Sequence, residues 1–360
     1  MLIYYLKIKK EVSMNEFRVM KKNVIYATFA GMLTLASAYA TATDSAIVVN
    51  VDNFNKAQTD HEFAGTLKMT GGINKFVHNR APTPVDKQNV IRMNRDTLYS
   101  MAVIDISKGA TVTLPNAGKR YMSLMIVNNN GYVNKVFYGA DPHKLTMEQF
   151  DTPFVFAAVR TLANPEDKAD LTKAHKLQDQ IKIEAGSAQV YVMPNYDEAS
   201  YKATLGPILE LSKGLKRYTH TFGSKSEVDP VHFMIGSASA WGGLPDKDAQ
   251  YYNIQPNLPV GNYELTVKDV PVKGFWSISL YNEQGYFQQN DLHSYSLNNL
   301  TAKPNSDGSY TIRFGGCTAT TENCLPIMEG WNYSVRMYEP STAIIDGSWK
   351  FPGPPVTRSK

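Results

Sequence analysis

Four polar residues interrupt an apolar stretch, VIRMNRDTLYSMAVID, at residues 90–105. Arg92, Asn94, Arg95 and Asp96 lie within five positions, and the residues after them have the β-branched, aromatic and methionine content of a buried strand. Guanidinium and amide groups bind anions and carbonyl groups, whereas a buried arginine–carboxylate pair fixes local geometry. The cluster therefore indicates either a site that faces a ligand or an internal device that holds the fold.

Strand alternation separates the members of this cluster. In a regular strand Asn94 and Asp96 share one face, and Arg95 and Tyr99 share the other. A bulge or a turn is needed to bring Arg95 and Asp96 together. We favour a structural role for Asp96, and for Arg92 and Asn94 both a ligand-facing and a loop-anchoring role stay open.

Two later strands carry a second set of candidates. In FWSISLY, residues 275–281, Trp276 lies on a face that is typical of a core, and Tyr281 lies on an amphipathic face that could line a groove. In NYSVRMY, residues 332–338, Arg336 shares a face with Ser334 and Tyr338. A solvated or paired arginine and a ligand-facing one are the alternatives there. The candidate ligand-binding residues are Arg92, Asn94, Arg95, Asp96, Tyr99, Trp276, Tyr281 and Arg336.

These strands belong to an internal repeat. Residues 121–133, YMSLMIVNNNGYV, align with residues 275–287, FWSISLYNEQGYF, with four identities and the same apolar positions. Upstream, RDTLY at 95–99 is weakly similar to KDAQY at 247–251, which matches Asp96 with Asp248. The pattern predicts two copies of one β unit, each with a strand, an Asn-x-x-Gly turn and a return strand.

The N-terminal residues have the pattern of a secretory signal. Lys21 and Lys22 precede an apolar segment that ends at a small-x-small site, which predicts a signal peptide over residues 1–40 with cleavage after Ala40. The start codon is Met1, Met14 or Met20. Residues 1–40 carry six Lys or Arg and two Glu, which accounts for the whole formal charge of +4. The remainder is neutral, which argues against nucleic acid, and no later stretch is long and apolar enough for a membrane span. We expect a periplasmic or secreted protein.

The two cysteines, Cys317 and Cys324, lie in GGCTATTENCLP. In an oxidising compartment a disulfide between them would close a small loop. A metal pair is the alternative, but no further ligands lie nearby in the sequence. We therefore expect the disulfide.

Most of the chain resembles a bacterial family of tandem domains of unknown function. The N-terminal motifs are FVHNR, VIRMNRDTLYSMAVID and VTLPNAGKRYMSL, and they are similar to DUF1254. The C-terminal motifs VKGFWSISLYNEQGYF, DGSYTIRF and DGSWKFPGPPV are similar to DUF1214. Asn94-Arg95 replaces the usual Pro-Asn of the family. The resemblance implies two tandem jelly-roll-like β sandwiches with helical decoration, and it implies no activity.

The expected organisation is mainly β with an internal duplication. Residues 41–195 would form an N-terminal sandwich with helices, 196–240 a helical linker and 241–360 a C-terminal sandwich. The seven histidines are scattered, and no pair has the spacing of metal ligands. His78 and His293 lie beside the motifs of the resemblance and are the candidate ligands of a divalent metal.

Common catalytic motifs are absent from the sequence. It lacks the serine-hydrolase elbow, the zinc-protease motif, the dinucleotide-binding glycines and the P-loop. Three hypotheses follow. The first is an envelope protein that binds a sugar or an organic acid in a groove between the two sandwiches. The second is a metal-assisted or carboxylate-based hydrolase, and the third is a structural homo-oligomer. We favour the binding protein because no nucleophile or metal motif is present.

Overall fold

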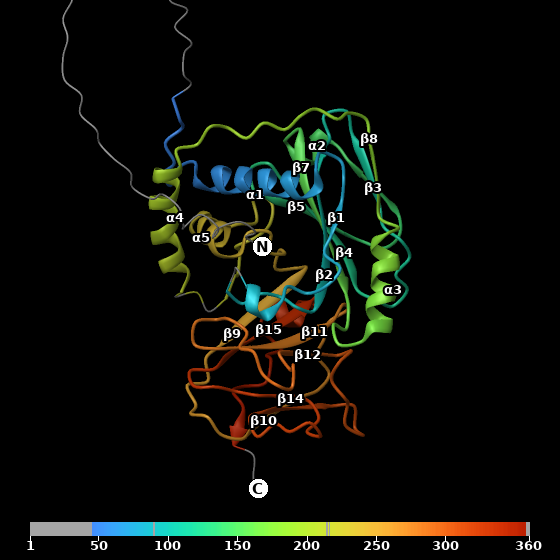
Figure 1. Cartoon of the computed structure of the whole chain (residues 1–360), viewed down its shortest axis with the longest axis vertical. Coiled ribbons are helices and arrows are strands. Elements are labelled where there is room, and N and C mark those ends of the chain that lie inside the picture. Colours follow the sequence, from blue (N-terminus) through green and yellow to red (C-terminus); the bar gives the residue numbers. More distant parts are fainter. Residues whose placement is uncertain (1–44, 89–90, 214, 216, 358–360) are drawn as a thin grey trace, which may run out of the picture.

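Two stacked sheets form in each half of the chain, as the alternating apolar residues require (Figure 1). The computed structural model describes residues 45–88, 91–213, 215 and 217–357. The predicted signal peptide and the three start codons lie outside these residues. Within them, sixteen strands form four sheets and there are six α-helices, so the chain is mainly β, as the sequence predicted.

The N-terminal half is built on a five-stranded sheet. Its order is β1-β2-β7-β4-β5, formed by Val77–His78, Thr97–Asp105, Phe154–Leu162, Met122–Asn128 and Val133–Tyr138. A second sheet has the order β6-β3-β8, formed by Pro142–Leu145, Ala110–Thr113 and Lys182–Ala185. Ile104, Val112 and Leu124 belong to one buried cluster that joins the two sheets. β2 begins at Thr97, so the strand predicted after the polar cluster is confirmed, and the cluster itself precedes the strand.

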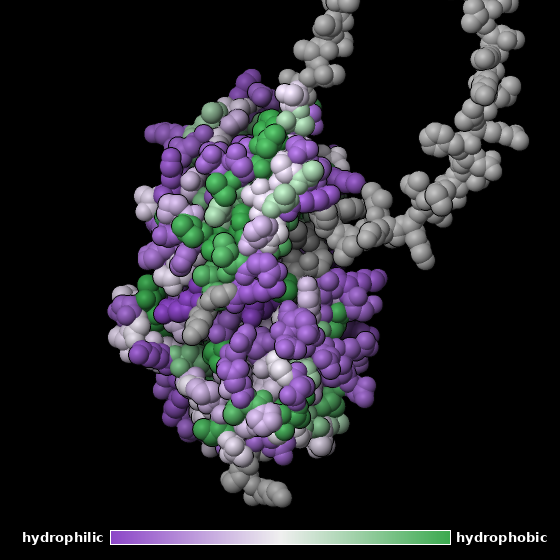
Figure 2. Space-filling view, turned by 90° about the vertical axis from the view of Figure 1, so that its left-hand side faces the viewer, coloured by the Kyte–Doolittle hydropathy of each residue, from purple (hydrophilic) through white to green (hydrophobic). Residues whose placement is uncertain are grey.

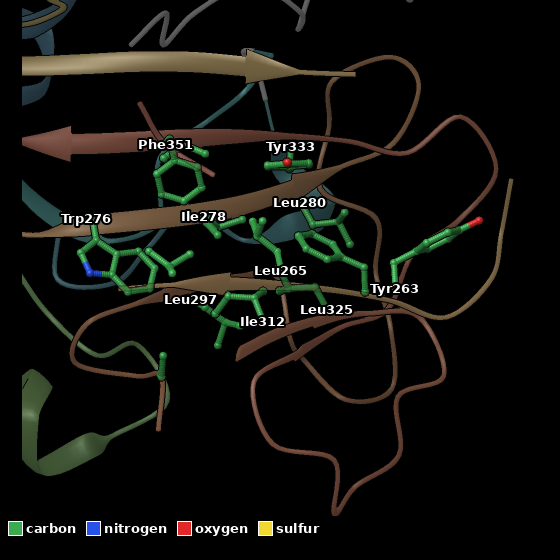
Figure 3. Packing of buried hydrophobic residues seen from close by; sticks show 14 of the residues in the cluster. Tyr263, Leu265, Trp276, Ile278, Leu280, Leu297, Ile312, Leu325, Tyr333 and Phe351 are labelled. Carbon is green, nitrogen blue, oxygen red and sulfur yellow. The ribbon is translucent and has the colours of Figure 1, made fainter. Parts of the chain in front are cut away.

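The C-terminal half has the same layered plan. One sheet has the order β12-β11-β15-β9, formed by Ser296–Asn298, Trp276–Tyr281, Asn332–Tyr338 and Ala249–Ile254. The other has the order β14-β13-β10-β16, formed by Cys324–Leu325, Tyr310–Phe314, Tyr263–Val267 and Val356–Thr357. Trp276, Ile278 and Leu280 lie in the core between these sheets (Figure 3). The predicted core face of FWSISLY is confirmed.

Helices cover one side of the N-terminal half. The helices α1 (Phe54–Thr70), α4 (Glu198–Ser212) and α5 (Pro230–Ala240) pack on one another, and α1 also contacts β2 (Figure 1). Their starts follow capping rules, since Asp197 and Asp229 accept hydrogen bonds from the first free N–H groups of α4 and α5. The segment expected to be a helical linker thus contributes α4 and α5 to this layer.

The remaining helical elements are short or peripheral. Helix α3 (Lys168–Gln178) lies on the opposite side of the first sheet from α4 and contacts β7 (Figure 1). One-turn elements are α2 (Met147–Phe150), α6 (Thr342–Ile345) and the 3-10 helix η1 (Val85–Lys87). In the described part of the chain, no helix has the length and apolar content to cross a bilayer.

The repeat predicted from the sequence extends to the strand order. β2-β7-β4-β5 in the first half corresponds to β9-β15-β11-β12 in the second, with each strand at the same place in chain order. The two Asn-x-x-Gly turns also match. In both turns the backbone carbonyl of the asparagine accepts from the glycine N–H at 2.9 Å. The asparagine Oδ1 accepts at 3.0 Å from the N–H of the tyrosine that follows the glycine.

Two buried aspartates join the halves reciprocally. Asp96 directly precedes β2 and accepts a hydrogen bond from Asn298 Nδ2 on β12, at 3.1 Å. Asp248 directly precedes β9 and accepts one from Tyr138 Oη on β5, at 3.0 Å. Each aspartate therefore binds the fourth repeat strand of the other half. These contacts are those expected of a structural residue.

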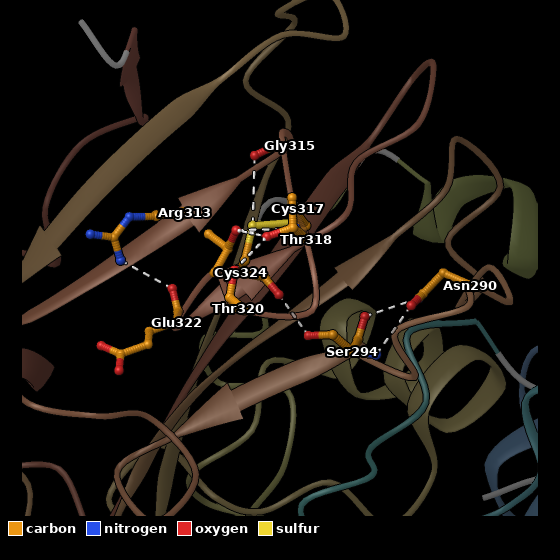
Figure 4. The surroundings of a disulfide bond; sticks show 10 residues. Asn290, Ser294, Arg313, Gly315, Cys317, Thr318, Thr320, Glu322 and Cys324 are labelled. Atoms are coloured by element: carbon orange, nitrogen blue, oxygen red, sulfur yellow. Dashed lines mark hydrogen bonds between the residues drawn. A yellow bond between two sulfur atoms is a disulfide. The ribbon is translucent and has the colours of Figure 1, made fainter. Parts of the chain in front are cut away.

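The predicted disulfide is present. Cys317 and Cys324 are bonded, with seven residues of sequence separation (Figure 4). Ser294 Oγ donates to the Cys324 carbonyl at 2.7 Å, and Arg313 Nη1 donates to the Glu322 carbonyl at 3.0 Å. The bond thus pins the loop that leads into β14.

Candidate functional site

A pocket of about 210 Å³ lies between the repeat sheets of the two halves. Strand β7 contributes Phe156, Ala158 and Arg160, and β15 contributes residues 334, 336 and 338. The end of α5 and the loop after it, residues 239–243, also line the pocket, together with Asn79, residues 81–83 and residues 91–94. The halves of the repeat therefore enclose a single space between them.

Arg160 is the most unusual residue of this pocket. Its side chain projects from mid-strand β7 and is 5% exposed. Nη2 donates to the Gly242 carbonyl at 2.6 Å, Nη1 lies 3.6 Å from Met125 Sδ, and the guanidinium lies 5.4 Å from the Tyr99 ring centroid. A guanidinium has five N–H donors, and a buried cation normally has a carboxylate partner. No Asp or Glu is among the described residues that line the pocket.

Arg336 occupies the equivalent place in the second half. In the backbone register, Arg336 on β15 lies opposite Tyr251 on β9 and Ser277 on β11. In the same way, Arg160 on β7 lies opposite Tyr99 on β2 and Ser123 on β4. The repeat thus places two mid-strand arginines, each between a tyrosine and a serine, on the walls of one pocket. Both belong to a Val-Arg dipeptide in a buried strand.

The two arginines differ in how many donors are engaged. Arg336 is 5% exposed and donates to Ser279 Oγ at 2.8 Å, to Tyr281 Oη at 2.8 Å and to the Arg92 carbonyl at 2.7 Å. It also lies in the field of Asp96, whose pKa burial raises while Arg336 lowers it in part. Arg160 has fewer strong acceptors and no such carboxylate. Arg160 is therefore the guanidinium best placed to bind an anion.

Asn94 and two phenols form the polar end of the pocket. Asn94 Nδ2 lies 3.2 Å from both Tyr99 Oη and Tyr338 Oη, and Asn94 Oδ1 accepts from the Asp96 N–H at 2.8 Å. Burial raises the pKa of Tyr99, but the Arg160 cation and the hydrogen bond with Asn94 outweigh it, so the net shift is downward. Burial raises the pKa of Tyr338 well above its usual value. The phenols are thus unequal, and Tyr99 is the more acidic.

The segment that holds Asn94 is fixed by the second half of the protein. The Arg92 N–H donates to the Gly285 carbonyl at 2.7 Å, and Tyr281 Oη donates to the Met93 carbonyl at 2.8 Å. Arg92 has a φ of 50°, which a non-glycine residue adopts only where surrounding contacts enforce it. Its Nε is buried without a hydrogen-bond partner among the described residues. The turn at Arg92 brings both Arg92 and Asn94 to the pocket.

Arg95 and Asp96 lie elsewhere. The Arg95 guanidinium donates to the Thr83 carbonyl at 2.5 Å and lies over the rings of Phe287 and Tyr295, at 5.9 and 5.3 Å. Burial lowers its pKa. Neither Arg95 nor Asp96 is among the residues that line the pocket, and no ion pair joins them in the described chain.

Two other predicted residues, Trp276 and Tyr281, also lie outside the pocket lining. Trp276 lies in the C-terminal core, 4% exposed, with its ring edge to Tyr310. Tyr281 is fully buried and supports Arg336 from behind the pocket lining. The pocket therefore brings together Arg92, Asn94, Tyr99 and Arg336 from the predicted set.

Neither candidate metal ligand is among the residues that line the pocket. His78 Nδ1 lies 2.7 Å from Ser100 Oγ, and burial lowers the pKa of this imidazole. His293 is exposed in a turn with a φ of 51°. Among the residues that the structure describes, no three His, Cys, Asp or Glu side chains are grouped to hold a metal ion.

The sequence analysis did not find Arg160, Trp241 or Tyr251. Trp241 directly follows α5 and reaches the pocket through the packing of that helix, with its ring against Phe156 of β7, so no local pattern pointed to it. Arg160 had a signal, since FAAVRTL places an arginine in a buried strand as NYSVRMY does. Extending the repeat comparison to these two strands would have identified it.

Comparison with known proteins defines the class of protein. Residues 73–185 match the family described as protein of unknown function DUF1254, and residues 246–342 match protein of unknown function DUF1214. The chain thus carries these two domains in tandem, in the order that the sequence predicted. No curated protein matches it.

The comparison with solved structures gives two matches. A crystal structure of a Vibrio parahaemolyticus protein, a structural-genomics target, matches with a TM-score of 0.59 at 18% identity, over 84% of this chain and 98% of that one. A crystal structure of an uncharacterised Burkholderia cenocepacia protein has a TM-score of 0.47 at 14% identity, over 81% of this chain and 84% of that one. The first of these likenesses supports the β-rich fold and carries no function.

Proposed function

We propose that this chain is an exported binding protein that holds a small organic anion in the pocket between its two halves. The observation that carries the proposal is Arg160, a buried guanidinium whose contacts are a carbonyl, a thioether and a phenol, with no carboxylate in the described lining. Burying a cation without a counter-ion costs several kcal/mol, so a fold retains one where a ligand supplies the negative charge.

The rest of the lining supports an anion over a neutral sugar. Arg92 and Arg336 add positive charge to the same walls, and Asp96, behind Arg336, has a pKa that burial raises. The described lining has no carboxylate, and its guanidinium groups are hydrogen-bond donors only, which suits an anionic ligand. Of the two ligand classes expected from the sequence, the organic acid is the better match.

Export is part of the proposal. The signal-peptide pattern of residues 1–40 and the Cys317–Cys324 disulfide both favour an oxidising compartment, the periplasm or the exterior.

The hydrolase hypothesis has less support. A carboxylate-based mechanism needs a carboxylate at the reacting bond, and the described lining has none. The oligomer hypothesis would draw on exposed apolar residues such as Leu211 of α4 and Val51. Such residues are mixed with hydrophilic ones on the face that Figure 2 shows, so we do not propose an interface there.

The test is a thermal-shift and calorimetric comparison of residues 41–360 with small carboxylates and with neutral sugars, in a buffer free of carboxylates and phosphate. A carboxylate at 100 times its Kd should stabilise the protein by about 2.7 kcal/mol. Added chloride should weaken binding, because the attraction is between charges.

Two variants locate the site. Arg160→Met should abolish the effect of carboxylates, and Arg313→Gln, which changes an arginine outside the pocket, should leave it unchanged. If sugars bind and carboxylates do not, or if Arg160→Met binds carboxylates as the wild type does, the proposal is wrong.

A further inference from the structure

The pocket has a polar end and an apolar end, set by the alternation of one strand. Phe156, Ala158 and Arg160 are successive pocket-facing residues of β7. Residues two apart on one face of a strand are about 6.7 Å apart, so about 13 Å separates the Phe156 and Arg160 backbone positions. A ligand whose anionic group contacts Arg160 must therefore extend its other end toward Phe156.

Aromatic side chains define the apolar end. The rings of Phe156 and Trp241 meet edge to face with centroids 5.0 Å apart, and Phe222 lines the same pocket. Ala158 lies between the two ends, opposite Met125 on β4. Its small side chain leaves the middle of the pocket open, where a larger residue would fill it.

The loop after α5 couples the two ends. The Gly242 carbonyl accepts from Arg160, in a backbone conformation with a φ of 77° that favours glycine. At Gly243 a Cβ would lie 2.2 Å from the Phe222 ring, so only glycine lets that ring pack there. Trp241, the preceding residue, donates Nε1–H to Thr59 Oγ1 at 3.1 Å, which fixes the indole. Three consecutive residues thus orient the cation and the aromatic wall together.

We propose, building on the function proposed above, that the ligand is an aromatic monocarboxylate with its carboxylate on Arg160 and its ring packed against the wall that Phe156 and Trp241 form together. Tyr99 and Tyr338 lie beside Asn94 at the polar end, where their hydroxyl groups can donate to the carboxylate. An apolar cavity of 150 Å³ holds a benzene ring, so about 210 Å³ accommodates a ring with a carboxylate and one small substituent.

A single guanidinium with free donors favours one carboxylate over two. Arg336 already donates to Ser279, Tyr281 and the Arg92 carbonyl, and its surroundings include Asp96. The apolar end offers no cation for a second carboxylate among the described residues. A dicarboxylate would have to bury its second charge against aromatic rings.

The experiment is isothermal titration of residues 41–360 with benzoate, acetate, benzamide, succinate and cyclohexanecarboxylate. Benzoate should bind about 100-fold more tightly than acetate, because the ring is removed from water. Benzamide has the same shape without the charge and should bind at least 10-fold more weakly than benzoate. Cyclohexanecarboxylate is apolar but not planar, and it should also bind more weakly than benzoate.

Larger side chains in the apolar part of the pocket distinguish the aromatic-ligand inference from the proposal of an anion site. Ala158→Leu should lower benzoate affinity at least 10-fold and leave acetate affinity within about 2-fold. Ala240→Leu, at the end of α5 and also on the pocket wall, is a second variant that changes a half-buried residue, and it should act in the same direction.

The outcomes are distinguishable. If acetate or succinate binds as tightly as benzoate, or if both leucine variants keep full benzoate affinity while folded, the aromatic inference fails and the anion site stands. If cyclohexanecarboxylate equals benzoate, the ligand is an apolar acid without an aromatic requirement, and the inference is wrong in that respect. If no carboxylate binds, both proposals fail.

Discussion

Replacing Arg160 by methionine should make the ligand-free protein more stable while it abolishes anion binding. Arg160 is 5% exposed, and its guanidinium donates to the Gly242 carbonyl and to Met125 Sδ, without a carboxylate in the described lining. Methionine is unbranched and fills irregular apolar space. The substitution therefore removes an uncompensated charge and keeps most of the packing.

The magnitude follows from the contacts. The hydrogen bond from the charged guanidinium to the Gly242 carbonyl contributes about 1.5 kcal/mol. The approach of the cation to the Tyr99 ring, at 5.4 Å, contributes about 1–2 kcal/mol. Burial of an unpaired cation costs several kcal/mol, so the net effect of its removal is a gain of about 1–3 kcal/mol in the free energy of unfolding. At about 2.1 cal/mol/K per residue over about 310 described residues, about 2 kcal/mol raises Tm by about 3 °C.

The assay is urea and thermal unfolding of wild type and variant in a buffer free of carboxylates and phosphate, so that no ligand stabilises the wild type. Arg120→Met is the matched control. Arg120 forms a two-point ion pair with Asp170, and their side chains are 14% and 19% exposed. Its loss should cost about 2 kcal/mol. A loss of the same size in Arg160→Met would refute the reasoning, because Arg160 would then hold the fold together rather than serve a ligand.

Three further outcomes are expected. Replacing Cys317 and Cys324 by serine should lower the free energy of unfolding by about 2.5 kcal/mol, the chain-entropy value for so short a loop, and urea denaturation would measure it. Burial raises the pKa of Asp96, so between the two pKa values the native state holds a proton that the unfolded state has lost. The free energy of unfolding should therefore fall as pH rises from about 4 through the raised pKa. Unfolding measured at several pH values should show a smaller fall in Asp96→Asn than in the wild type, and an equal fall would contradict this. Gly131→Ala should lower the free energy of unfolding by about 1–3 kcal/mol more than Gly139→Ala does. Both glycines have a positive φ, but only a Cβ at position 131 would lie 2.7 Å from the hydroxyl of Thr59 on α1. Equal Tm losses would show that the contact relaxes.

Some features of the site were accessible from the sequence because they depend on short-range periodicity. Strand alternation placed Trp276 on a core face and Arg336 on the face it shares with Ser334 and Tyr338. In the structure Trp276 lies in the C-terminal core, and Arg336, Ser334 and Tyr338 all line the pocket. The repeat predicted that Asp96 and Asp248 are counterparts, and they make reciprocal hydrogen bonds between the halves. The alternation rule failed just before β2, where the turn at Arg92 turns Asn94 toward the pocket and Arg95 away from it.

The sequence by itself determined the mainly β composition, the tandem family, the disulfide and the repeat. Each of these features can be predicted from local patterns, namely the residue type at every second position, the turn residues and the cysteine spacing. The tertiary structure decided which polar residues share a space. Arg160 and Tyr99 are 61 positions apart but paired on adjacent strands, and Trp241 reaches them only through the packing of α5. A buried charge without a partner is defined by what surrounds it, and the surroundings come from distant parts of the chain.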